Sequence, residues 1–197
     1  MRTRVGVAIL AAGAARRFTR PKQLAPWRGT TLVRAITHEA CMSSADYVAV
    51  VVGAHAFEIM PELEDYRAVV IPNPLWREGV ASSVRAAALW ATTARCDGLA
   101  IVLCDQARLT SAHLDALIAA HRLTHRSIAS FYAGTIGAPA VFDKREFAAL
   151  LELEGDTGAQ SVLMSAKPAA VDWPDGSFDI DTPNDLVAET ELRPTVR

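Results

Sequence analysis

The chain has 197 residues, of which 51% are apolar and 21% are charged, and its formal net charge is −2. This length suffices for one α/β domain with a sizeable core, and the composition is that of a soluble globular protein. No apolar run reaches the ~20 residues that span a bilayer, and the N-terminal run is too short for a signal peptide, so we expect no membrane partner.

The three cysteines indicate a reducing environment. Cys41, Cys96 and Cys104 form no CxxC motif and cannot all pair with one another. We therefore expect a cytoplasmic protein.

Charge is distributed unevenly along the chain. Residues 1–38 carry eight Lys or Arg and no acidic residue, whereas residues 168–192 carry seven Asp or Glu and no Lys or Arg. Such a basic start and acidic end suit a site where an anion and a metal meet, although both could be solvated surface. We expect no nucleic-acid partner.

Apolar, β-rich runs alternate with helix-like stretches. The runs are nearly continuous, which is typical of strands buried on both faces. They cover residues 5–10, 47–53, 67–71, 98–104 and 127–132. The helical patterns cover residues 30–43, 80–95 and 111–124, and Thr110 is the expected N-cap of the last.

This alternation predicts a Rossmann-like three-layer α/β sandwich with a mostly parallel sheet. No repeat or linker divides the chain. We expect a single domain over residues 1–197, with a core at about 4–190 and a C-terminal tail at 191–197.

Ligands of such sheets bind beyond the carboxyl ends of the strands. The residues that follow four of the predicted strands are therefore candidates for the site. They are Ala11-Ala12-Gly13, Gly53, Asn73 and Asp105.

The stretch Leu10-Ala11-Ala12-Gly13 predicts a loop with little side-chain bulk, followed by cations. Its backbone amides could approach a phosphate closely, and Arg17 and Lys22 could neutralise that phosphate. The stretch is neither a Walker A loop nor a GxGxxG motif. An ordinary tight turn with exposed cations remains an equal alternative.

The segment at residues 73–87 combines a turn with a helix start. Asn73-Pro74 favours a turn, and Ser82 and Ser83 fit the first turn of a helix whose free N–H groups face a ligand. The same pattern also fits a capped helix with Trp76 lying over the core.

Aspartates supply candidate metal ligands. Asp105 ends an apolar run, where a carboxylate suits Mg²⁺, although a turn aspartate is an alternative. Asp179 and Asp181 would share one face of an extended stretch, although Asp181 also suits a helix entry before Pro183.

The motifs together resemble a known family. The pattern LAAGxxxRxxxxKxL, from Leu10 to Leu24, resembles the signature of nucleotidyltransferases related to the molybdenum cofactor guanylyl- and cytidylyltransferases. The resemblance implies that this loop grips a nucleoside triphosphate, and that Arg17, Lys22 and Asp105 are catalytic. LAAG rather than LAGG is similar to the cytidylyl branch, which implies CTP.

The other motifs appear in the family's order. They are NPxWxxGxxSS at 73–83, a GxPxxF-like stretch at 135–142, a GDxGAR-like stretch at 153–163 and DIDTPxDL at 179–186. With the strand-end residues, the expected nucleotide-binding set is Leu10, Ala11, Ala12, Gly13, Arg17, Lys22, Gly53, Asn73, Ser82 and Ser83. The expected acceptor-binding set is Trp76, Gly79, Gly137, Pro139, Asp156 and Gly158.

The resemblance implies a metal-dependent transfer. Asp105 and Asp181 would hold Mg²⁺, with Asp179 a weaker second choice. The enzyme would transfer CMP from CTP to the phosphate of molybdopterin, release pyrophosphate, and hand the product to a molybdenum hydroxylase apoenzyme.

Two alternatives remain open. One is the same chemistry on a sugar phosphate, methylerythritol phosphate or phospholactate, or with GTP as donor. The other is a non-catalytic chaperone that binds a nucleotide or cofactor. Thr19, Ala107 and Gln160 support the second alternative, because they depart from the family's pattern.

Overall fold

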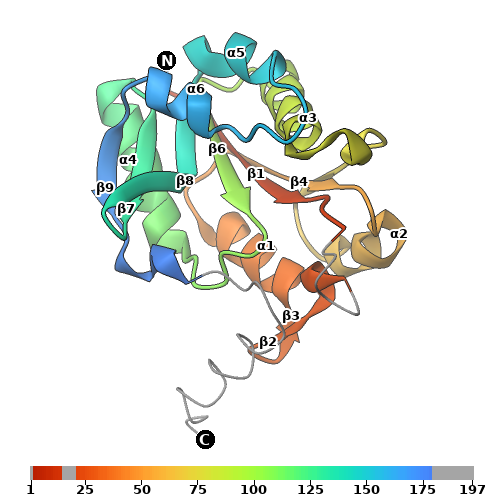
Figure 1. Cartoon of the computed structure of the whole chain (residues 1–197). Coiled ribbons are helices and arrows are strands. Elements are labelled where there is room, and N and C mark those ends of the chain that lie inside the picture. Colours follow the sequence, from red (N-terminus) through yellow and green to blue (C-terminus); the bar gives the residue numbers. More distant parts are fainter. Residues whose placement is uncertain (1, 15–20, 179–197) are drawn as a thin grey trace, which may run out of the picture.

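The computed structural model describes residues 2–14 and 21–178, which form a central sheet of seven strands in the order β5-β4-β1-β6-β8-β7-β9 (Figure 1). The strands are β1 (Val5–Ala11), β4 (Tyr47–Val52), β5 (Val69–Pro72), β6 (Gly98–Leu103), β7 (Ile128–Tyr132), β8 (Thr135–Asp143) and β9 (Ala169–Asp172). Only β8 runs antiparallel to its neighbours in this sheet. The predicted mostly parallel α/β sheet is confirmed.

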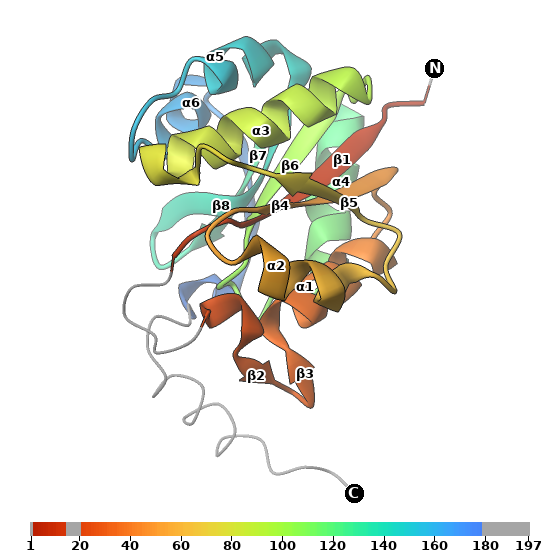
Figure 2. The same cartoon turned by 90° about the vertical axis from the view of Figure 1, so that its right-hand side faces the viewer.

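Helices cover both faces of the sheet (Figures 1 and 2). One face carries α1 (Leu32–Met42), α2 (Ala56–Ile59) and α4 (Ser111–Thr124), and the other carries α3 (Val80–Thr93), α5 (Phe147–Leu151) and α6 (Gln160–Ser165). Short elements complete the described chain: β2 (Pro26–Trp27), β3 (Thr30–Thr31), and the 3₁₀ turns η1 (Lys22–Leu24), η2 (Met60–Leu63), η3 (Trp76–Glu78), η4 (Lys144–Glu146) and η5 (Pro174–Ser177).

The central strand β1 shows why its apolar pattern is continuous. Val7 and Ile9 pack into the core under α1 and α4, while Ala8 packs under α3. A Cβ at Gly6 would lie 2.9 Å from Trp90 of α3. Small residues on that face therefore let α3 approach the sheet closely, whereas branched residues fill the other side.

Differences from the predicted elements have local causes. The predicted helix at 30–43 begins only at Leu32, because residues 30–31 pair with residues 26–27 as a β-hairpin. Strands β8 and β9 were not predicted. The predicted helices at 80–95 and 111–124 correspond to α3 and α4, and the Thr110 hydroxyl accepts a hydrogen bond from the His113 amide at 3.3 Å, as an N-cap does.

None of the helices in the described part of the chain is long and apolar enough to cross a membrane. The predicted domain limits stay a prediction, since their C-terminal end lies outside the described residues.

Candidate active site

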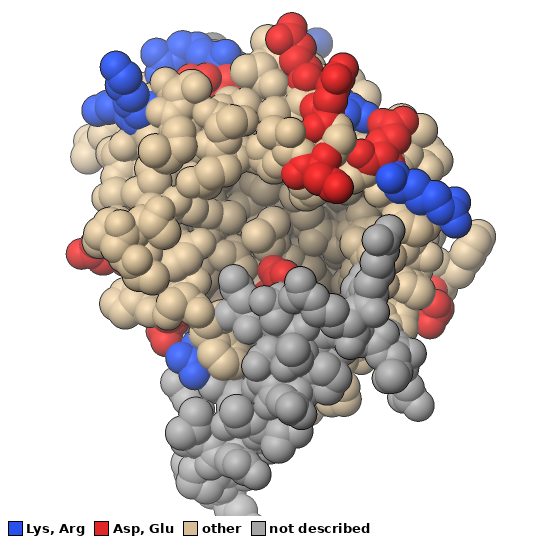
Figure 3. All heavy atoms as spheres, viewed as in Figure 1, with Lys and Arg blue, Asp and Glu red and all other residues tan. Residues whose placement is uncertain are grey.

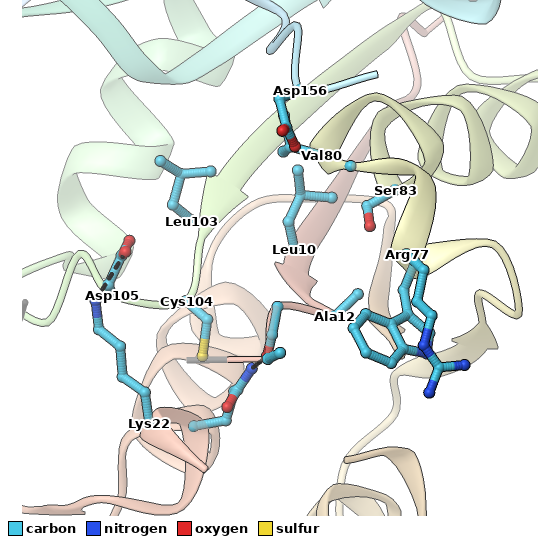
Figure 4. A pocket seen from close by; sticks show the side chains of 15 residues that line it. Leu10, Ala12, Lys22, Arg77, Val80, Ser83, Leu103, Cys104, Asp105 and Asp156 are labelled. Carbon is cyan, nitrogen blue, oxygen red and sulfur yellow. Dashed lines mark hydrogen bonds and ion pairs between the residues drawn. The ribbon is translucent and has the colours of Figure 1, made fainter. Parts of the chain in front are cut away.

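A cleft of about 690 Å³ opens at the carboxyl ends of β1 and β6 (Figure 4). The space-filling view shows this face of the molecule hollowed at its centre (Figure 3). The predicted site residues that line the cleft are Leu10, Ala12, Gly13, Lys22, Trp76, Gly79, Ser83, Asp105 and Asp156. Residues more than 140 positions apart in the sequence thus meet in one cavity, at the sheet edge that the sequence indicated.

The loop after β1 is held by its carbonyl groups. Gln23 donates from Nε2 to the carbonyls of Ala11 and Gly13, at 2.9 and 2.8 Å, and the Ala54 amide donates to the carbonyl of Ala12 at 3.1 Å. In a trans peptide the N–H points opposite to the C=O, so the following amides point away from these donors. The loop therefore has the geometry to offer N–H groups to an anion.

Gln23 was not predicted as a site residue. Its side chain is buried, and its only sequence signal is its position next to Lys22. Gln23 therefore fixes the backbone of the loop through its two hydrogen bonds to loop carbonyls.

Lys22 and Asp105 form an ion pair across the cleft, with Lys22 Nζ 3.0 Å from Asp105 Oδ2 (Figure 4). In the alternative of an ordinary tight turn, the cation at position 22 would be exposed, but only 15% of the Lys22 side chain is exposed. The turn η1, in which the Leu24 amide donates to the Pro21 carbonyl at 2.9 Å, directs the lysine inward. The ammonium and the carboxylate are thus already in contact.

The second carboxylate oxygen of Asp105, Oδ1, has the properties of a metal ligand. Asp105 Oδ1 is buried and has no hydrogen-bond partner among the described residues. A hard carboxylate oxygen that lacks a donor suits Mg²⁺ or Mn²⁺. The described residues hold no group of three or more His, Cys, Asp or Glu that could bind a metal. A second protein ligand would come from elsewhere, and the predicted Asp181 lies outside the described residues, as do Asp179 and Arg17.

The loop around Asp105 explains one departure from the family's pattern. The Ala107 amide donates to the Asp105 carbonyl at 2.8 Å. A proline at position 107 would lack this N–H. The alanine therefore allows a tight turn that leaves the carboxylate at the mouth of β6.

Asn73 and Ser82 support the cleft from behind. Asn73 Nδ2 donates to the hydroxyls of Ser82 and Ser83, at 2.9 and 3.0 Å, and its Oδ1 accepts from the Leu75 amide at 3.0 Å. These contacts tie the turn after β5 to the start of α3. Of the three predicted nucleotide-binding residues here, only Ser83 lines the cleft.

Gly53 also acts through packing. A Cβ at this position would lie 2.7 Å from Trp76 Cβ and 2.8 Å from the Ala12 carbonyl. Any larger residue would push the loop after β4 away from both neighbours. The predicted role of Gly53 in nucleotide binding is therefore at most indirect.

A cation that the sequence analysis missed lies on the far side of the cleft. The Arg77 guanidinium stacks over the Trp76 ring at 4.6 Å. Figure 4 places Arg77 across the cleft from Lys22 and Asp105, with Ala12 between them. Its only sequence signal is its position in a loop after a strand, where ligands bind.

Acidic side chains border the cleft on one side. Glu78, Glu152 and Glu154 line a shallow depression of about 540 Å³, and Asp156 lies in the cleft. Figure 3 shows acidic residues gathered above the central hollow. We call Glu152, Glu154 and Asp156 the acidic rim.

A second pocket of about 400 Å³ adjoins the cleft and shares Leu10, Val80 and Leu103 with it. None of the described residues that line it is charged. Gly137 and Gly158, both predicted to bind the acceptor, line this pocket. The remaining lining residues are Val84, Ile101, Tyr132, Thr135, Ile136, Ala138, Ala140, Phe142, Ala159, Gln160 and Leu163.

Pro139 lies behind the wall of this second pocket. Its carbonyl accepts from the Ser130 hydroxyl at 2.7 Å, and Ser130 is in turn 2.7 Å from His113 Nε2. Burial lowers the pKa of His113 to about 4, so the imidazole is neutral at pH 7 and donates to Ser130. This buried network fixes the wall and is closed to solvent, which gives it a structural role.

Gly79 joins the cleft to the segment before α6. Its φ is +109°, and a Cβ there would collide with the Gly155 carbonyl, which accepts from the Ala81 amide at 3.1 Å. We expect Gly79→Ala to lower the free energy of unfolding by about 1–3 kcal/mol through this strain and contact. Urea denaturation measures the change. Gly158→Ala is the matched control, since a Cβ there meets nothing within 4 Å. Equal stability of both variants would contradict the prediction.

Comparison with known proteins shows the family of the chain. The MobA-like NTP transferase domain matches residues 7–170. Nicotine blue oxidoreductase of Paenarthrobacter nicotinovorans is 34% identical over 189 residues, with 88% of this chain and 90% of the relative covered. Purine catabolism protein PucB of Bacillus subtilis strain 168 is 30% identical over 197 residues, with 92% and 93% covered.

Solved structures show the same fold. Rv0371c of Mycobacterium tuberculosis H37Rv is 29% identical, with a TM-score of 0.82 over 97% of this chain and 100% of that one. A second structure of Rv0371c, a complex with manganese, has a TM-score of 0.76 with the same coverage. The motifs, the fold and these matches agree, and the chain belongs to the MobA-like NTP transferase family.

Proposed function

We propose that this protein transfers CMP from CTP to the phosphate of molybdopterin and releases pyrophosphate. One observation carries the proposal: a cleft that contains the ion pair of Lys22 and Asp105 adjoins a pocket whose described lining residues are uncharged. The cleft suits a charged triphosphate, and the pocket suits the body of the acceptor. The two meet at Leu10, Val80 and Leu103.

The reaction needs alignment and charge neutralisation more than acid or base catalysis. An oxygen of the acceptor phosphate forms a bond to the α-phosphorus of CTP. The bond from the α-phosphorus to the α,β-bridging oxygen breaks, and pyrophosphate leaves with that electron pair. The amides of the loop after β1 bind the triphosphate, and Lys22 balances its charge.

Asp105, together with Asp181, would hold a divalent cation. When bound, this ion neutralises charge on the phosphate oxygens. The unpartnered Oδ1 of Asp105 and the manganese complex of the relative Rv0371c support this part of the proposal.

The acceptor proposal rests on the second pocket, because the names of the two sequence relatives point to different reactions. A mostly apolar wall can pack against the flat face of the fused ring system of molybdopterin, whereas a sugar phosphate, methylerythritol phosphate or phospholactate offers no such face. Hand-over of the product to a molybdenum hydroxylase apoenzyme remains part of the proposal.

Pyrophosphate release tests the function. The rate is measured with CTP, GTP, ATP and UTP, each with and without molybdopterin. We expect CTP with molybdopterin to give the highest rate, since Leu10-Ala11-Ala12-Gly13 resembles the cytidylyl branch. A higher rate with GTP than with CTP would show that GTP, not CTP, is the nucleotide donor. Nucleotide binding without turnover on any acceptor would favour the non-catalytic alternative.

A further inference from the structure

We propose that Gln106 is a positioning residue, which holds the Asp105 carboxylate at a fixed place relative to the wall of the second pocket. The inference rests on the proposed function and adds a residue to it. Gln106 directly follows Asp105 in the chain, and only 1% of it is exposed. Its side chain therefore acts inside the protein and contacts no ligand directly.

The amide of Gln106 joins two parts of the site. Its Oε1 accepts from the Leu103 amide at 3.4 Å, and its Nε2 donates to the Ala138 carbonyl at 2.7 Å. Leu103 ends β6 and lines both cavities, whereas Ala138 lies on β8 in the wall of the second pocket. One side chain thus bridges the loop that carries the metal ligand and the pocket that receives the acceptor.

The backbone of Gln106 strengthens this bridge. Its amide donates to the Leu103 carbonyl at 3.2 Å, and its carbonyl accepts from the Leu109 amide at 2.9 Å. Asp105 is enclosed between these contacts and the turn made by Ala107. The side-chain bond to Ala138 is the contact that sets the distance between this loop and β8. Loss of that bond frees the carboxylate to shift relative to the acceptor.

Partners that orient a metal ligand commonly contribute 10–100-fold to metal affinity. We therefore expect Gln106→Leu to weaken Mn²⁺ binding in the presence of CTP by about tenfold or more. Electron paramagnetic resonance of free Mn²⁺ measures this affinity without turnover. The affinity for CTP without metal, measured by calorimetry, should change less than about threefold, because among the described residues Gln106 forms hydrogen bonds with Leu103, Leu109 and Ala138 and not with residues 12–14 after β1.

Gln106→Met separates the hydrogen bonds from simple packing. Methionine keeps the length of the side chain but cannot donate to the Ala138 carbonyl. Mn²⁺ affinity of Gln106→Met should therefore fall by a factor similar to that of Gln106→Leu, whereas full affinity would show that packing alone holds the loop.

Gln160→Leu is the matched control. Gln160 Nε2 donates to the Ile136 carbonyl on the same strand at 2.9 Å, but this bond lies away from the Asp105 loop. Mn²⁺ affinity should be unchanged in this variant. Unchanged affinity in Gln106→Leu or in Gln106→Met would overturn the proposal. If Gln106→Leu fails to fold, Gln106→Met decides. If wild type releases no pyrophosphate while Mn²⁺ affinity responds as expected, the proposed function fails and the role of Gln106 stands.

Discussion

Asp105→Asn is expected to reduce pyrophosphate release from CTP by at least about 10²-fold, since it removes the charge that would hold the proposed divalent cation. The asparagine keeps the size of the side chain and one oxygen. The buried Oδ1 has no hydrogen-bond partner among the described residues, so this oxygen is open to a cation. Steady-state rates at several Mg²⁺ concentrations measure the effect, and higher Mg²⁺ should restore part of the rate.

The shared-metal hypothesis adds a second test. Asp181→Asn should cost a similar factor, and the double variant should be little worse than either single one, because two ligands of one ion act as a unit. Asp175→Asn is a control, since Asp175 is an exposed carboxylate that pairs with Arg108 at 3.4 Å outside the cleft. An Asp181→Asn variant with normal Mn²⁺ affinity would contradict a shared ion.

Lys22→Met should change two affinities in opposite directions. Nucleotide binding should weaken by about tenfold or more, because a charge-assisted contact to phosphate is lost. Mn²⁺ binding without nucleotide should strengthen, because the Lys22 ammonium lies 3.0 Å from the carboxylate oxygen that a cation needs. Like charges at such a separation repel strongly in a partly buried site. Calorimetry with CTP alone and with Mn²⁺ alone separates the two effects.

Lys144→Met provides the control for this pair. Lys144 Nζ lies 2.9 Å from Asp97 Oδ1, so it forms the same type of ion pair away from the cleft. Neither affinity should change in that variant. If Lys22→Met leaves both affinities as in wild type, the lysine neither binds the triphosphate nor competes with the metal.

Much of the fold could be predicted because burial leaves a strong pattern. Strands β1, β4 and β6 are buried on both faces, and their continuous apolar runs identify them. Strand β9, with half-exposed residues, and the two-residue strands of the hairpin have no such pattern. Their positions depend on pairing with distant residues, which one sequence does not show.

For the candidate site, the sequence predicted residues that line one cleft, but not the contacts between them. The strand-end rule and the motifs identified Asp105 and Lys22, 83 positions apart. Their mutual ion pair was not foreseen, because it depends on the inward direction of the η1 turn. Gln23 and Gln106 were not predicted as site residues. Their buried side-chain amides donate to backbone carbonyls, and the positions of those carbonyls depend on the tertiary structure.

The acidic rim has a consequence for how fast substrates arrive. A negative field at an entrance slows the approach of anions, and the effect grows with the charge of the approaching molecule. CTP without a metal carries about two more negative charges than its complex with one divalent ion, so the rim repels it more. We therefore expect Asp156 in the cleft, with Glu152 and Glu154 in the neighbouring depression, to slow the association of free CTP more than that of its metal complex. Added salt shortens the range of this field, so it should narrow the difference in association rate between the two forms of the nucleotide.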